Sequence, residues 1–178
     1  VNFAQSADAR VSTRAGTPSD FSSPEDKARL LAIRATGDAV MVGHGTLAAD
    51  RMTLGLPDLS LQDARLARGQ PRFPLRVILS REGRIDPGLR VFSAEGGPIL
   101  LFSSVFMVPE VREALTSFPR LHLHLSEHRE AVLPDALRIL ERDHGVRRLV
   151  CEGGPTLFRS LVELGRVDEL NLTLCPLL

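Results

Sequence analysis

The 178-residue chain contains no tryptophan and no tyrosine, and aromatic residues make up only 4% of it. Proteins that bind single-stranded nucleic acid stack bases on aromatic side chains, so this composition disfavours that class. The chain also lacks a charge of one sign, because 22 Lys and Arg residues balance 22 Asp and Glu residues. Bulk electrostatic binding to nucleic acid or to an anionic membrane is therefore disfavoured too. A charged ligand must be held by a local group of residues.

Cysteine and long apolar runs are also scarce. Cys151 and Cys175 are too few for a disulfide framework and too far apart for a zinc site. We interpret both as buried free thiols in a reducing compartment, the cytoplasm. No apolar run approaches the roughly 20 residues of a membrane span, and no signal peptide is visible. The chain begins without Met and stops within an apolar pattern, so we expect a longer natural product.

Short apolar segments alternate with helical patterns along the chain. Strands are predicted at 1–5, 38–42, 75–79, 98–102, 121–125, 148–151 and 169–174. Helices are predicted at 24–36, 46–50, 59–68, 109–116, 134–144 and 156–164. Ser23, Pro24 and Gly37 illustrate the signals: an N-cap, a first-turn proline and a terminating glycine. The alternation predicts a single α/β domain over 1–178, with a mainly parallel central sheet and helices on both faces.

Two strand-to-helix junctions carry paired glycines. The first is Gly43-His44-Gly45-Thr46, and the second is Glu152-Gly153-Gly154-Pro155-Thr156. Ligands of parallel sheets bind at the carboxyl ends of strands, where backbone N–H groups of helix starts can hold a phosphate. Neither junction is a complete dinucleotide fingerprint or a Walker loop, so glycines that only shape tight turns remain an alternative.

These junctions and their surroundings resemble the pyrimidine reductases of riboflavin biosynthesis. The motifs VGHGTLAAD at 42–50 and EGGPTL at 152–157 carry most of the resemblance. Segments 2–13, 23–25, 34–35, 38–41, 74–80, 167–170 and 176–178 follow in register. The wider superfamily includes dihydrofolate reductase, so the resemblance implies a dihydrofolate-reductase-like fold. A deaminase zinc signature (His-x-Glu with Pro-Cys-x-x-Cys) is not present, which leaves a reductase half or a stand-alone reductase.

The resemblance implies NADPH-dependent reduction of a ribosylaminopyrimidine 5′-phosphate to its ribityl form. The implied cofactor residues are Gln5, Gly45, Thr46, Ser80, Arg81, Gly153, Gly154, Pro155, Thr156 and Leu157, with the helix start continuing to Ser160. The implied substrate contacts are Asn2, Ser19, Arg34 and Glu152. We assign catalysis to Asp50, as proton donor, and Glu152, as acceptor of pyrimidine N–H groups. No metal is implied, and a homodimer is expected, also from the apolar run 170–178.

One stretch departs from the family pattern. After Asp50 the family continues with a second Asp and a Pro, whereas this chain has Arg-Met-Thr-Leu-Gly-Leu at 51–56. That stretch normally helps to hold the substrate phosphate. Two alternatives therefore stay open: a related reductase of a pterin, a folate or another substrate, and a member that has lost pyrimidine reduction. On the plainer interpretation, Asp50 only ends its helix and Glu152 forms a structural salt bridge.

Histidines offer a weaker signal. His122 and His124 lie two apart on one predicted strand, as metal ligands can, but no carboxylate or cysteine completes a ligand set. We interpret them as the solvated face of a strand. His44, within the first glycine turn, either contacts the cofactor or is a variable loop residue.

Overall fold

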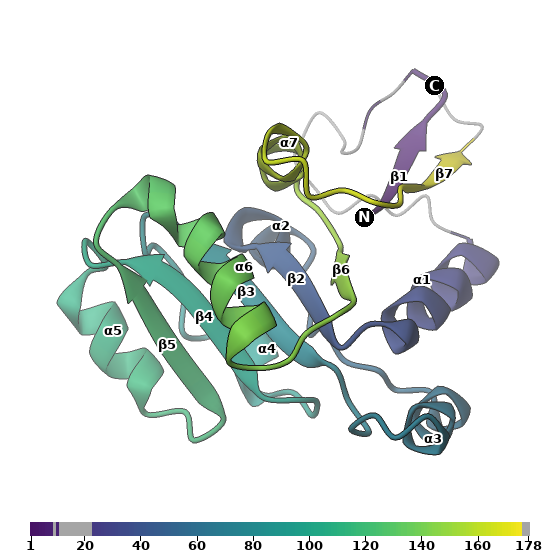
Figure 1. Cartoon of the computed structure of the whole chain (residues 1–178), viewed down its shortest axis with the longest axis horizontal. Helices are drawn as coiled ribbons and strands as arrows, with labels where there is room; N and C mark the ends of the chain where they lie inside the picture. Colours follow the sequence, from purple (N-terminus) through teal and green to yellow (C-terminus); the bar gives the residue numbers. More distant parts are fainter. Residues whose placement is uncertain (9, 11–22, 176–178) are drawn as a thin grey trace.

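The computed structural model describes residues 1–8, 10 and 23–175. In these ranges a five-stranded parallel sheet has the order β5-β4-β3-β2-β6 (Figure 1). Its strands are β2 (Ala39–Gly43), β3 (Leu75–Ser80), β4 (Ile99–Ser104), β5 (Leu121–Ser126) and β6 (Leu149–Cys151). Parallel neighbours require crossover connections, and helices fill most of these connections. The predicted α/β class with a parallel central sheet is confirmed.

The helices are close to their predicted positions. They are α1 (Pro24–Thr36), α2 (His44–Ala49), α3 (Leu59–Ala67), α4 (Arg90–Ser93), α5 (Pro109–Thr116), α6 (Val132–Arg142) and α7 (Pro155–Glu163). Helix α4 and the 3₁₀ turn η1 (Arg129–Ala131) were not predicted, because each is too short to show a periodicity. Helix α6 begins two residues before the predicted start at Pro134. A proline is tolerated there because N–H groups in the first turn have no intrahelical partner.

Side chains of the sheet alternate between two buried layers. Ala39 and Met41 on β2 belong to the layer that α6 and α7 cover. Val40 and Val42, which point to the opposite face, pack with residues of α2, α4 and α5. All four side chains are fully buried. Helices therefore cover both faces, and the core consists of one apolar layer on each side of the sheet.

The first and last strands do not join the central sheet. Strand β1 (Asn2–Ser6) pairs in parallel only with β7 (Asn171–Cys175), which makes a separate two-stranded sheet. Figure 1 shows this pair, purple and yellow, beyond β6. Strands were predicted at both places, at 1–5 and 169–174, and both are present. The sequence did not indicate that they pair with each other and not with the central sheet.

A buried arginine, Arg76, stabilises the connection between β3 and β4 through hydrogen bonds. Arg76 is only 1% exposed to solvent. Its Nε donates a hydrogen bond to the Gly97 carbonyl oxygen at 2.8 Å. Its Nη1 donates to the carbonyl oxygens of Val91 and Ala94, at 2.8 and 3.2 Å. Burial lowers the pKa of Arg76 to about 10, so the group remains charged at neutral pH. The sequence pattern does not predict that Arg76 is buried or that it binds the carbonyl groups of this connection.

Both cysteines are free and buried, as predicted. Burial raises the pKa of the Cys151 thiol to about 11, so the thiol stays protonated at neutral pH. Among the described residues, no helix is both long enough and apolar enough to cross a membrane.

The interpretation of strand β5 as carrying a solvated histidine face is wrong for one of its two histidines. His122 is exposed, but the His124 ring stacks on Phe102, with ring centroids 4.8 Å apart. Its Nε2 is buried and finds no hydrogen-bond partner among the described residues. Burial lowers the pKa of His124, as do the nearby rings of His144 and His122, while Asp143 opposes the shift. Packing against the neighbouring strand therefore keeps this histidine neutral.

We expect His124 to make the protein less stable in mild acid. Since its pKa is lower in the folded state, the unfolded state binds the proton more readily. The free energy of unfolding is therefore highest above the ordinary histidine pKa of about 6.5 and decreases as the pH falls below it. His124→Phe keeps the stacking and removes the titrating group, so the melting temperature should change less between about pH 7.5 and 5.5. His128→Gln removes an exposed histidine that does not contribute to the His124 shift, so it should keep the wild-type slope; identical slopes in all three proteins would contradict this explanation.

Candidate functional site

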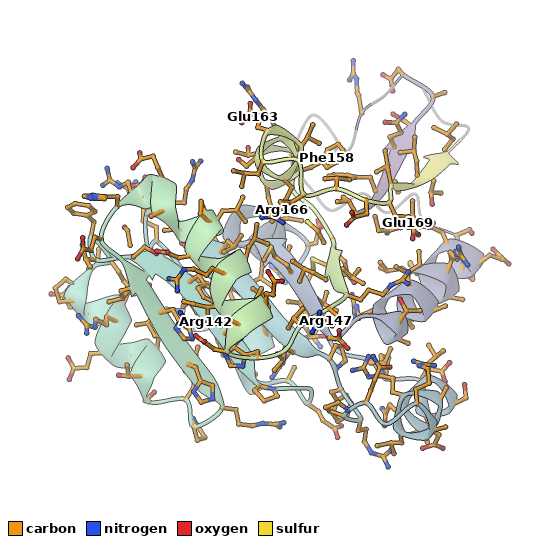
Figure 2. The ribbon with its side chains drawn as sticks, in the orientation of Figure 1. Arg142, Arg147, Phe158, Glu163, Arg166 and Glu169 are labelled. Atoms are coloured by element: carbon orange, nitrogen blue, oxygen red, sulfur yellow. The ribbon has the colours of Figure 1, made fainter. Side chains whose placement is uncertain are left out.

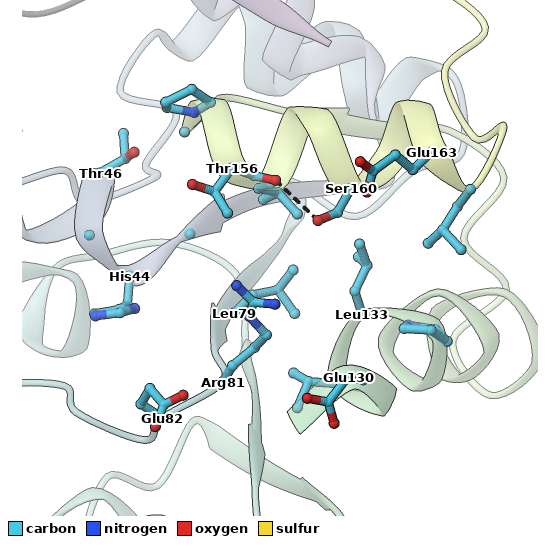
Figure 3. A pocket seen from close by; sticks show the side chains of 18 residues that line it. His44, Thr46, Leu79, Arg81, Glu82, Glu130, Leu133, Thr156, Ser160 and Glu163 are labelled. Carbon is cyan, nitrogen blue, oxygen red and sulfur yellow. Dashed lines mark hydrogen bonds between the residues drawn. The ribbon is translucent and has the colours of Figure 1, made fainter. Parts of the chain in front are cut away.

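A cavity of about 620 Å³ opens at the carboxyl ends of β2 and β3 (Figure 3). Four segments form its walls: the turn after β2, the end of β3, the start of α6 and one side of α7. The lining residues are Gly43, His44, Gly45, Thr46, Leu79, Arg81, Glu82, Glu130, Val132, Leu133, Pro134, Gly154, Pro155, Thr156, Leu157, Ser160, Glu163 and Leu164. This is the edge at which parallel sheets bind ligands, as the sequence predicted.

Helix α7 presents its amino end to this cavity. Its N-cap is Gly154 and its first residue is Pro155, and no side chain caps the helix start. The first turn also contains no acidic residue. The first N–H groups of a helix have no intrahelical partners and form the positive end of its dipole. This end of α7 is therefore suited to a phosphate group.

The two glycine turns pack against each other. The Gly43 N–H donates to the Gly153 carbonyl oxygen at 3.3 Å. Gly153 has a φ of 106°, a backbone angle that residues other than glycine rarely adopt. A Cβ on Gly154 would lie 2.6 Å from Thr46 Oγ1, closer than van der Waals contact allows. The second turn thus needs both glycines, one for its backbone conformation and one for the close approach of Thr46.

The structure brings most of the predicted cofactor residues together. Those that line the cavity are Gly45, Thr46, Arg81, Gly154, Pro155, Thr156 and Leu157, together with Ser160. Three do not line it. Gly153 lies in the adjoining turn, Gln5 lies on β1, and the Ser80 side chain is completely buried. The Ser80 hydroxyl finds no hydrogen-bond partner among the described residues and does not reach the cavity. The charged side chains that follow β3 and line the cavity are Arg81 and Glu82.

Arg34 and Glu152 form a buried, two-pronged ion pair. Arg34 Nε donates to Glu152 Oε1 at 2.7 Å, and Nη2 donates to Oε2 at 2.6 Å. The side chains are only 8% and 2% exposed. Arg34 Nη1 also donates to the carbonyl oxygen of Gly55. The pair therefore connects α1, the end of β6 and the segment after α2, and both Glu152 oxygens already accept a hydrogen bond.

Asp50 lies outside the cavity. It is exposed and ends helix α2, where its N–H donates to the Thr46 carbonyl oxygen at 2.9 Å. Surrounding protein atoms displace part of the water around its carboxyl group, which raises its pKa. Thr46 therefore links Asp50 to the cavity wall through one turn of helix. Of the other predicted substrate contacts, Asn2 begins β1 and Ser19 lies outside the described residues.

The segment that departs from the family pattern has an unusual backbone. Arg51 and Leu54 have φ values of 47° and 54°, in the left-handed region that residues other than glycine rarely occupy. Such a residue costs on the order of 1–3 kcal/mol, so surrounding contacts must hold it. Leu54 and Leu56 are almost completely buried and provide such contacts. The segment is therefore anchored in the core.

One wall of the cavity carries no motif in the sequence. Glu130 lines it from the turn η1 after β5, Val132 and Leu133 line it from the start of α6, and Glu163 lines it from α7 (Figure 2). The rule that ligands lie at strand ends could have pointed to the turn after β5, but no glycine marks that turn. His44 does line the cavity, and burial lowers its pKa, which favours the neutral ring. In the described part of the chain, no group of three His, Cys, Asp or Glu side chains is arranged to hold a metal.

Comparison with known proteins gives a match over the whole chain. The family model of the RibD C-terminal domain matches residues 1–178. A 2,5-diamino-6-ribosylamino-4(3H)-pyrimidinone 5′-phosphate reductase from Archaeoglobus fulgidus is 32% identical over 177 residues, which cover 99% of this chain and 79% of that protein. A protein of the same name from Methanothermobacter thermautotrophicus is 30% identical over 185 residues, covering 100% of this chain and 77% of that protein.

Solved structures show the same fold. A pyrimidine reductase-like protein from Corynebacterium diphtheriae superposes with a TM-score of 0.77 at 20% identity, covering 99% of this chain and 73% of that chain. Acinetobacter baumannii RibD superposes with a TM-score of 0.76 at 20% identity, covering 99% of this chain and 45% of that chain. At this identity the likeness concerns the fold alone.

The Arg34–Glu152 pair should dominate the stability of the site. Glu152→Gln leaves the buried guanidinium without its anion, so we expect a loss of about 3–5 kcal/mol in urea unfolding. The double variant Arg34→Met/Glu152→Gln should lose much less than the sum of the two single variants. The exposed pair of Arg159 and Glu163 is the control, since Glu163→Gln should leave stability almost unchanged. Additive losses in the cycle would contradict the assignment.

Proposed function

The chain belongs to the RibD C-terminal domain family, and we propose that it is a reductase of riboflavin biosynthesis that converts a ribosylaminopyrimidine 5′-phosphate to its ribityl form. One observation carries the proposal: the cavity at the carboxyl edge of the sheet, into which α7 presents an uncapped amino end. The names of the two archaeal relatives, both 5′-phosphate reductases, support the substrate class.

We propose NADPH as the reductant. The groups that line the cavity fit a dinucleotide, because the uncapped start of α7, with no acidic residue in its first turn, suits the pyrophosphate. When bound, the cofactor supplies the hydride that C1′ of the opened ribose accepts. Thr156, Leu157 and Thr46 would hold it from two sides of the cavity. Figure 3 shows Arg81 reaching into the same space from the end of β3.

Arg81 should favour NADPH over NADH. A guanidinium that contacts the 2′-phosphate contributes about 1.5–3 kcal/mol, equivalent to a factor of ten or more in affinity. Arg81→Gln should therefore weaken NADPH binding at least about tenfold and change NADH binding by less than about twofold. The cofactor's own fluorescence reports both affinities. Arg84→Gln, an exposed arginine of the same loop that does not line the cavity, is the control. Equal wild-type affinities for the two cofactors would contradict this role.

We propose that Asp50 delivers the proton that accompanies the reduction. Its raised pKa favours the protonated form that a general acid needs. Glu152 directly precedes the Gly153-Gly154 turn, and each of its oxygens that accepts from Arg34 keeps a further lone pair for a pyrimidine N–H group. In this arrangement Glu152 recognises and orients the substrate, and Arg34 fixes the position of its carboxylate.

Asp50→Asn should reduce kcat at least about tenfold, because general acids contribute roughly 10²–10⁴ in rate. Affinity for the cofactor should stay within about twofold, since Asp50 does not line the cavity. Steady-state kinetics with a saturating pyrimidine substrate measures both. Asp63→Asn, an exposed carboxylate on α3, is the matched control. A normal kcat in a folded Asp50→Asn protein would assign proton delivery to another group.

The direct test of the function is an NADPH-oxidation assay that compares ribosylaminopyrimidine 5′-phosphates with dihydrofolate. We expect turnover of a ribosylaminopyrimidine only. Turnover of dihydrofolate alone would favour a folate reductase, a candidate kept by the altered segment 51–56. Cofactor binding without turnover of either would indicate a member that has lost pyrimidine reduction.

We further propose a cytoplasmic homodimer. Leu170, Leu172 and Leu174 are 49%, 47% and 67% exposed, and they recur at every second position along β7 and the residue before it. An apolar strand face of this kind is expected to be covered by a partner. A second copy of the chain is that partner, so sedimentation should give twice the monomer mass, and a monomer at micromolar concentration would contradict the proposal.

A further inference from the structure

The charges around the cavity are unequally compensated. Glu82 is paired with Arg129, at 3.1 Å from Nε to Oε2, and Glu163 is paired with Arg159, at 2.7 Å from Nε to Oε1. His44 is held toward the neutral form, because burial lowers its pKa. The other two charged groups that line the cavity are Arg81 and Glu130, and neither forms a salt bridge with any described residue.

Glu130 forms no salt bridge with the neighbouring residue Arg129, which pairs with Glu82. Arg129 points to Glu82 and covers the ring of Phe106, 4.9 Å from the ring centroid. Both contacts hold this guanidinium in place, which leaves the neighbouring carboxylate without a counterion. In Figure 3, Glu130 and Arg81 both lie across the cavity from α7. A ligand in the cavity therefore meets one cation and one anion on that side.

NADPH and NADH differ by a single 2′-phosphate, which carries close to two negative charges. A cation near that group favours NADPH, whereas an unpaired carboxylate disfavours it without affecting a neutral hydroxyl. Proteins often set a preference by placing a repulsive charge against one ligand as well as an attractive charge for the other. The cavity holds one charge of each sign that is not in a salt bridge with a described residue: the cation Arg81 and the carboxylate Glu130.

We propose that Glu130 is a specificity-determining residue that limits the preference for NADPH which Arg81 creates. The inference rests on the proposed function, because it concerns the cofactor of that same cavity. Glu130 acts by electrostatic repulsion across the cavity and requires no contact with the reacting atoms. Its position in the turn between β5 and α6 gives the carboxylate access to the side of the cavity opposite α7.

The test is a direct binding titration of NADPH and NADH, followed by cofactor fluorescence, with no pyrimidine present. Glu130→Gln removes the charge and keeps the shape, so NADPH affinity should rise about threefold or more, while NADH affinity changes by less than about twofold. The gain should shrink as salt is raised, because exposed charges are screened. Glu127→Gln, an exposed glutamate three residues earlier that does not line the cavity, should change neither affinity.

An equal change in both affinities, or a change in neither, would overturn the role of Glu130 while leaving the proposed function intact. A gain reproduced by Glu127→Gln would overturn it as well, since the effect would then follow net charge rather than position. A wild-type protein that binds neither cofactor would contradict the proposed function and this inference together. Since Glu130 is exposed and makes no salt bridge with a described residue, the variant is expected to fold normally.

Discussion

The candidate site depends on one buried ion pair. Arg34 in α1 grips Glu152 at the end of β6, and its remaining nitrogen holds the carbonyl oxygen of Gly55. The two residues are 118 positions apart in the chain. The pair thus fixes three segments next to the second glycine turn: α1, the end of β6 and the segment after α2. Because a buried charge is costly without its partner, each side chain makes the other indispensable.

Arginine serves the same purpose elsewhere in the molecule. Arg65 is completely buried and donates to the carbonyl oxygens of Ala35 and Gly37 at 3.0 and 2.5 Å, just where α1 ends. Arg76 donates hydrogen bonds to carbonyl oxygens of the β3–β4 connection. Helix ends and loops leave carbonyl groups unpaired, and the guanidinium can serve several of them at once. Several of the cations counted in the neutral composition therefore lie inside the protein and are not available to a ligand.

The sequence allowed much of the framework to be predicted. Helices α1 and α5 begin and end as expected, because Ser23, Pro24, Gly37 and Pro109 are local signals with local causes. The two glycine turns were also identified, since a strand followed by paired glycines and a helix has few alternatives. The separation of β1 and β7 from the central sheet could not be predicted, because strand pairing depends on segments that are far apart in the sequence. The candidate site likewise contains residues that local motifs predict and residues that only packing places. Thr46, Arg81 and Gly154 were found from motifs, whereas the burial of Ser80 and the position of Glu130 follow from packing alone.

Reduction of a ribosylaminopyrimidine 5′-phosphate by a nicotinamide cofactor bound at α7 can be followed by the fate of the hydride. NADPH that carries deuterium at the transferable position is oxidised by the protein, and the pyrimidine product is analysed by mass spectrometry. We expect a ribityl product that contains one deuterium at C1′. Oxidation of the cofactor with no deuterium in the pyrimidine, or recovery of the unchanged ribosyl compound, would contradict it.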